Sequence, residues 1–107
     1  MLYPDTPTVY IVQKPDEKKN ILSAQTWGKL EFILSEKQDL FWEPEKTVTE
    51  IKKVLSNFND NDYLLLIGDP ALIGICTAIA CDQNHGFVKF LKWDNREFKY
   101  YPVEIKL

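Results

Sequence analysis

The stretch that decides the fold is residues 60–86, which read DNDYLLLIGDPALIGICTAIACDQNHG. After a polar turn, an apolar run over Tyr63–Ile67 has strand character, and a tight turn then leads into an apolar segment that starts at Pro70. Asp69 suits the N-cap position, and Pro70 suits the first helical position, where a backbone N–H would have no partner anyway. The stretch therefore predicts a strand that leads directly into a helix, as in the core of an α/β protein.

Strand patterns lie on both sides of this unit. Apolar alternation and β-branched residues predict five further strands: Thr8–Gln13, Lys29–Ser35, Leu40–Trp42, Phe87–Trp93 and Phe98–Leu107. The Leu40–Trp42 strand is expected to be short and to pair back on the strand before it. Pro102 cannot donate a ladder hydrogen bond, so we expect the last strand at a sheet edge. The charged segment Lys14–Asn20 predicts an exposed loop.

A capping motif predicts the start of a second helix. Thr47 and Glu50 have the spacing of a capping box, and apolar residues recur at helical spacing from Val48 to Phe58. We expect Ile21–Gly28 to be irregular, with Trp27 on the core. The order β-β-β-α-β-α-β-β predicts one α/β domain over residues 1–107, with a mixed sheet of about five strands and two helices. The strands joined by the apolar helix should be parallel.

Composition limits the functions that are open to the chain. It has 107 residues, 45% of them hydrophobic and 13% aromatic, and a net charge of −3, which predicts a folded domain. Twelve lysines accompany a single arginine, so a main role in binding duplex DNA is disfavoured. The apolar run Ala71–Cys81 is too short to span a bilayer, and without a basic-then-apolar pattern among the first residues we expect no secretion. We expect a cytoplasmic protein without a membrane partner.

The cysteines and the single histidine predict no catalytic or metal site. Cys76 and Cys81 lie five apart on one helix and point in different directions, so they cannot bridge each other. Cys81 and His85 have i, i+4 spacing, but the carboxyl end of a helix disfavours a thiolate and no third orienting group follows. With Asp82 these side chains match no zinc signature. We expect no catalytic residue, no metal and no cofactor, and hence a protein that is not an enzyme.

The turn at Gly68 and Asp69 is where an open α/β sheet would place a ligand. Asp69 puts its own carboxylate at the positive helix end, which disfavours a phosphate there, and the Gly-rich spacing of a nucleotide loop is absent. We expect Asp69 to cap its own helix. An enzyme centred on this turn stays an alternative that would need a polar pocket.

The apolar helix has a face of small residues. The bulky side chains Leu72, Ile73, Ile75, Cys76 and Ile79 gather on the other side and should pack on the sheet. The small face comprises Ala71, Gly74, Thr77, Ala78 and Cys81. Either the first helix covers this face, or a second copy of the chain or another protein does. The sequence thus predicts a protein-binding domain that acts as a homodimer, and water on the Gly74–Ala78 flank of a single chain would undo that interpretation.

The carboxyl-terminal hairpin offers an alternative function. Residues 87–107 carry five basic and three acidic side chains, a local charge of +2 in a chain that is otherwise −5. Aromatic and basic side chains alternate there, as in surfaces that stack single-stranded bases. The candidate nucleic-acid face comprises Lys89, Lys92, Trp93, Arg96, Lys99 and Tyr100.

Several motifs together resemble one group of viral proteins. They are Asn57–Pro70 with Ala71 and Gly74, Leu91–Asp94, Tyr101–Val103 and also Val9–Gln13. These residues are similar to small proteins from tailed phages of marine cyanobacteria, over roughly the second half of the chain. The resemblance implies a virus-encoded protein that acts in a bacterial cytoplasm. It carries over no activity, cofactor or catalytic residue.

Overall fold

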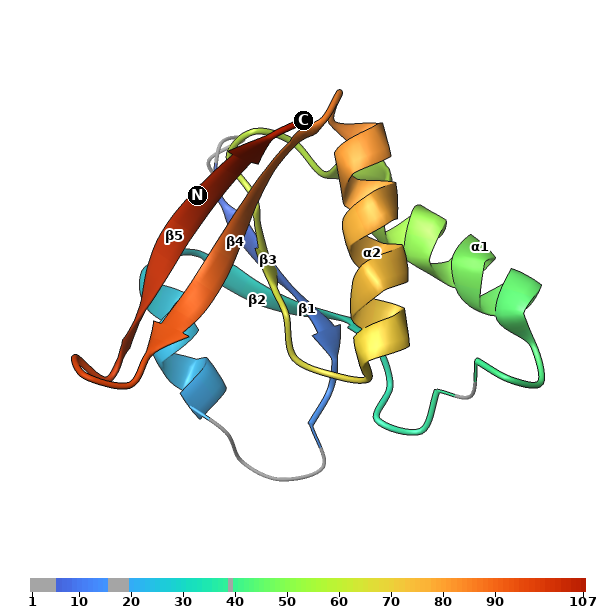
Figure 1. Cartoon of the computed structure of the whole chain (residues 1–107), viewed down its shortest axis with the longest axis horizontal. Coiled ribbons are helices and arrows are strands. Elements are labelled where there is room, and N and C mark those ends of the chain that lie inside the picture. The colour runs from blue at the N-terminus through green and yellow to red at the C-terminus, as the bar shows by residue number, and fades with distance from the viewer. Residues whose placement is uncertain (1–5, 16–19, 39) are drawn as a thin grey trace.

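A computed structural model describes residues 6–15, 20–38 and 40–107, and within them five strands form a single sheet (Figure 1). The strands are β1 (Thr8–Gln13), β2 (Lys29–Leu34), β3 (Tyr63–Leu65), β4 (Phe87–Asp94) and β5 (Lys99–Lys106). Their spatial order is β2-β1-β3-β4-β5; the first four are parallel, and β5 runs antiparallel to β4. The predicted mixed sheet is confirmed, with β5 and its Pro102 at an edge.

The helices cover the two faces of the sheet unequally. Two α-helices, α1 (Pro44–Val54) and α2 (Pro70–Gln83), pack on one face, and the 3-10 turn η2 (Leu55–Asn57) continues α1. Tyr10 and Val12 of β1 belong to the core on that side. Val9 and Ile11 point to the other face, which the 3-10 helix η1 (Asn20–Thr26) covers only in part. The sheet is thus buried on both sides under β1 but thinly covered beyond η1.

Three local predictions are wrong. Leu40–Trp42 forms a turn instead of a strand, because Leu40 packs on the helical side of the core while Trp42 is 83% exposed. The chain therefore has one strand fewer before α1 than predicted. Ile21–Gly28 is not irregular but lies mostly in η1, which buries Ala24. Trp27 does pack on the core, edge-on to Tyr63 at 5.7 Å. Of the predicted Lys14–Asn20 loop, residues 16–19 lie outside the described residues.

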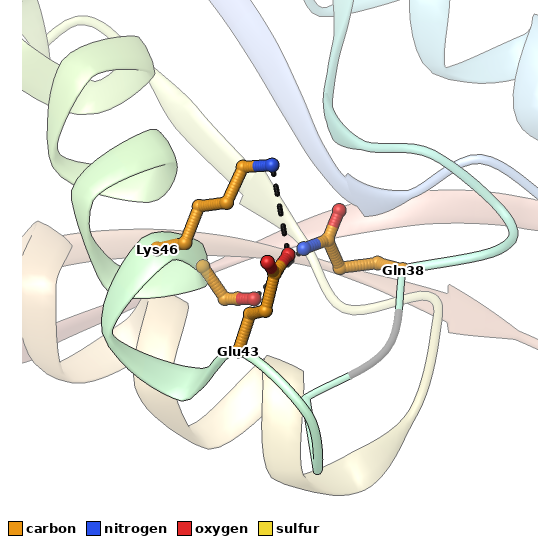
Figure 2. Close-up of polar contacts among 4 residues, drawn as sticks. Gln38, Glu43 and Lys46 are labelled. Carbon is orange, nitrogen blue, oxygen red and sulfur yellow. Dashed lines mark hydrogen bonds and ion pairs between the residues drawn. The ribbon is translucent and has the colours of Figure 1, made fainter.

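The third wrong prediction is the start of α1, which begins at Pro44 rather than at Thr47. Pro44 takes the first helical position, so Thr47 lies one turn inside the helix and donates its backbone N–H to the Glu43 carbonyl at 3.0 Å. The buried Thr47 hydroxyl accepts a hydrogen bond from Gln38 Nε2 at 2.7 Å instead of capping. Figure 2 shows Gln38 beside this first turn, where Lys46 pairs with Glu43 at 3.5 Å.

Candidate groove between β3 and β4

The usual ligand position of this sheet order is filled by the protein itself. In the order 2-1-3-4-5 the crevice lies between the carboxyl ends of β1 and β3. The Gln13 side chain occupies that crevice: its Nε2 donates to the carbonyls of Ser35 (3.1 Å) and Glu36 (3.3 Å), and its Oε1 accepts from the Asp69 N–H at 3.0 Å. Asp69 Oδ1 accepts from the Ala71 N–H at 2.9 Å, which confirms the predicted self-capping.

A groove opens one strand further along the sheet because β3 ends early. The Ile67 N–H donates to the Leu65 carbonyl at 3.0 Å, which closes a γ-turn centred on Leu66. The Ile67 carbonyl then accepts from the Gln13 N–H at 3.0 Å, so the chain turns toward β1 and away from β4. β3 and β4 pair only through Leu64 and Leu65, whereas β4 continues to Asp94.

The resulting β3–β4 groove has a volume of about 680 Å³. Its lining residues are Leu65–Ile67, Phe90–Trp93, Tyr100, Val103, Asn20 and Asn95. Most of this lining is apolar, and Leu66 and Val103 are each 37% exposed. Pockets that bind small molecules commonly have this size and a mostly apolar lining. The groove is thus exposed apolar surface at the strand ends, one position away from the filled crevice.

Aromatic packing and positive charge define the outer end of the groove. Trp93 meets Tyr100 edge-on at 5.0 Å, and burial raises the pKa of the Tyr100 hydroxyl, so that ring stays neutral. A smaller hollow of about 380 Å³ shares Lys92 and Trp93 with the groove and adds Arg96. Asp94 Oδ1 accepts the Arg96 N–H at 2.8 Å, so this carboxylate is engaged in the hairpin turn. Lys92 therefore lines the groove, and Arg96 lies with Asp94 in the hollow next to it.

The predicted small-residue face of α2 is only partly a face. Ala71, Gly74 and Ala78 are exposed, Thr77 is half-buried and donates its hydroxyl to the Ile73 carbonyl, and Cys81 is buried in the core. The placement of Cys81 on an open face is therefore wrong, because the end of α2 turns that side chain inward. A Cβ at Gly74 would meet nothing within 4 Å, so α1 does not cover the flank.

The bare flank bears on both alternatives that the sequence left open. Cover by the first helix is wrong, since α1 leaves Gly74 and Ala78 exposed. The predicted interface also required that this flank not be open to water in a single chain. Gly74 and Ala78 are open to solvent, so the interpretation of the flank as an interface is not supported either. We therefore assign no function to the small-residue face of α2, and homodimerisation stays a prediction.

The predicted nucleic-acid face is divided between the two sides of the hairpin. Cross-strand pairing places Lys92 and Lys99 on the side of α2, and Lys89, Trp93 and Tyr100 on the side of η1, with Arg96 in the turn. Lys89 lies over the Tyr63 ring at 4.2 Å, and Tyr100 is buried. The six residues do not form one surface on which bases could stack.

Cys76, Cys81 and Asp62 are buried side chains of the fold. Both cysteines are free and buried, and burial raises the pKa of Cys76 to about 12. Asp62 accepts the N–H groups of Thr8 and Asn59, each at 3.0 Å, and so joins β1 to the turn before β3. In the described part of the chain no three His, Cys, Asp or Glu side chains are grouped to hold a metal ion, and no helix is long and apolar enough to cross a membrane.

Sequence reasoning missed three residues that shape this region. Gln13 ends a strand with no pattern that marks it as a bridge between three segments. Leu66 continues an apolar run, so nothing in the sequence marks the γ-turn. Trp42 belongs to a segment whose aromatic composition favours a strand, so nothing in the sequence marks its exposure.

The fold and the groove define a small α/β domain whose open surface is apolar and lies at the strand ends. The chain belongs to the family described as Phage Pam3 gp32-like protein, whose model matches residues 7–107. This match supports the phage protein that the resemblance implied, and it leaves the marine cyanobacterial host without support. No curated protein and no solved structure matches the chain.

Proposed function

We propose that this phage protein is a non-enzymatic domain that acts in the host cytoplasm by binding another protein through the β3–β4 groove. The observation that supports the proposal is an apolar groove of about 680 Å³, in a structure whose described residues hold no group of three His, Cys, Asp or Glu side chains placed to bind a metal ion. A host or viral protein is the partner class that fits a phage product of this size.

The lining of the groove favours a protein segment over other ligands. Leu66, Phe90 and Val103 offer apolar contact, while Lys92 and Arg96 lie at one end. An apolar side chain followed by an acidic one matches this arrangement, because the apolar group fills the groove and the carboxylate meets the cations. A polar small molecule would find few hydrogen-bond partners there, since the lining is mostly apolar.

A comparison of baits tests the proposal. Tagged wild-type protein, Leu66→Glu and the control Leu22→Glu are each exposed to extracts of infected and uninfected host cells. Leu66 and Leu22 are both exposed, but only Leu66 lines the groove, so the pair separates loss of the groove from added charge. We expect a protein retained by wild type and by Leu22→Glu to be lost on Leu66→Glu. Equal retention on all three baits would contradict the proposal.

The nucleic-acid alternative has its own readout. Quenching of tryptophan fluorescence by a single-stranded oligonucleotide at low salt, with loss of quenching as salt rises, would favour it. We expect no quenching, because Lys92 and Trp93 point to opposite faces of β4.

A further inference from the structure

The turn that precedes α1 exposes two aromatic side chains on a braced frame. Phe41 is 96% and Trp42 83% exposed, the highest values among the large hydrophobic side chains of the described residues. The frame is held by Gln38, which donates to the Thr47 hydroxyl at 2.7 Å, and by Leu40, which packs into the core below it. Figure 2 shows Gln38, Glu43 and Lys46 converging at this point. Both aromatic side chains are thus exposed just before the start of α1.

This turn and the β3–β4 groove open at the same end of the sheet. The turn follows the carboxyl end of β2, and the groove lies at the carboxyl ends of β3 and β4, which run parallel to β2. Figure 1 shows the carboxyl ends of β1, β2 and β4 directed to the lower part of the view, where the segment before α1 also lies. Within one chain, β1 and β3 lie between β2 and the groove. The exposure of Trp42 shows that it does not reach the groove of its own chain.

The two surfaces are complementary in polarity and in charge. Residues 36–46 contain four acidic and two basic side chains, a net −2, while residues 87–107 contain five basic and three acidic ones, a net +2. Glu43 directly follows Trp42. Lys92 lines the groove, and Arg96 lies in the hollow next to it. An indole that enters the groove would thus bring its neighbouring carboxylate toward the cations.

From this complementarity we infer that the occupant of the groove is the Phe41–Trp42 turn of a second copy of this chain. The inference rests on the proposed function, since it names the partner of the same groove. A two-fold axis between turn and groove lets each copy donate its turn to the other, so the contact closes into a dimer. The two aromatic side chains of each turn bury ~150–250 Å² apiece, so the two turns together remove roughly 600–1,000 Å² from water, to which the groove surfaces add.

Light scattering after gel filtration tests the dimer with two single variants. We expect wild type to give 25 kDa, twice the 12.5 kDa of the chain. Trp42→Ala removes the anchor and Leu66→Glu blocks the groove, so each alone should give 12.5 kDa, whereas the exposed control Leu22→Ala should stay dimeric. Circular dichroism and thermal unfolding confirm that each variant is folded.

A mixture of the two variants supplies the decisive result. Trp42→Ala keeps an intact groove and Leu66→Glu keeps an intact turn, so a mixed pair retains one of the two contacts. We expect the mixture to associate measurably although neither variant does so alone. A wild-type monomer at all concentrations, a dimer that survives both substitutions, or a mixture that stays monomeric would each overturn the inference. If wild type is monomeric yet Leu66→Glu still loses a host protein as bait, the groove keeps its proposed function and only self-docking fails.

Discussion

Replacing Gln13 with alanine should be among the most destabilising changes of a polar residue in this chain. The side chain is 9% exposed and makes three hydrogen bonds, to the carbonyls of Ser35 and Glu36 and from the Asp69 N–H. These bonds connect the carboxyl end of β1 to the end of β2 and to the start of α2. Their removal leaves three backbone groups to find water in a narrow crevice.

The magnitude follows from these contacts. A typical intramolecular hydrogen bond contributes ~1 kcal/mol net, and the exposed positions of Ser35 and Asp69 let water replace part of what is lost. We expect Gln13→Ala to lower the free energy of unfolding by roughly 2–3 kcal/mol. For a domain of this size that loss lowers the Tm by roughly 10–15 °C.

Urea unfolding followed by circular dichroism measures the loss, and two further variants assign it. Gln13→Met keeps most of the volume without the hydrogen bonds, so it should be nearly as destabilised as Gln13→Ala. Gln13→Glu can still accept from Asp69 but turns a carboxylate oxygen toward two carbonyls, so it should be no better. A loss below ~0.5 kcal/mol for Gln13→Ala, or full stability for Gln13→Met, would refute the bridging role.

Four further predictions test individual parts of the fold. Burial raises the pKa of the Cys76 thiol from 9.0 to about 12, so the thiol of the unfolded chain ionises first and the free energy of unfolding should fall as pH rises above 9. This group contributes a slope of up to ~1.4 kcal/mol per pH unit. Urea unfolding repeated across pH should show that this part of the slope is absent in Cys76→Ala. Asp62→Asn replaces one acceptor by a donor that faces a backbone N–H, and should cost ~1–3 kcal/mol by urea unfolding. Gly68 has a φ of +140° and a Cβ there would meet Gln13 Cβ at 2.7 Å, so Gly68→Ala should lower the Tm by several degrees, and an unchanged Tm would contradict that geometry. Gly74→Ala should instead stabilise the protein by ~0.5–1 kcal/mol and leave the mass by light scattering unchanged; a shift in mass would restore the α2 flank as an interface.

The main elements of the fold could be predicted because local chemistry decides them. Asp69 and Pro70 start α2 in the expected way, and Pro102 lies on the edge strand, since capping and the missing N–H act through near neighbours. The start of α1 could not be predicted, because the Thr47 hydroxyl accepts a hydrogen bond from Gln38 instead of capping the helix. That contact depends on how the preceding turn packs. Leu40–Trp42 has strand composition, but of its three side chains Leu40 packs on the core, and the segment forms a turn instead of pairing with a strand.

The candidate site was harder to predict than the fold. Neither Gln13 nor Leu66 lies in a motif, because the role of each arises from segments far apart in sequence: Gln13 meets Asp69 across 56 positions, and the groove needs β3 to end before β4. The predicted hairpin face failed for a simple reason. Alternation along a strand sends neighbouring residues to opposite sides, so the side chains of Lys92 and Trp93 point to opposite faces of the sheet.

The brevity of β3 has a mechanical consequence. Two residue pairs, Leu64 with Phe90 and Leu65 with Leu91, join the part of the sheet formed by β2, β1 and β3 to the β4–β5 hairpin. Eight residue pairs join the two strands of that hairpin. So short a junction can bend while each part of the sheet stays rigid. Bending there would let the groove widen or narrow around side chains of different size.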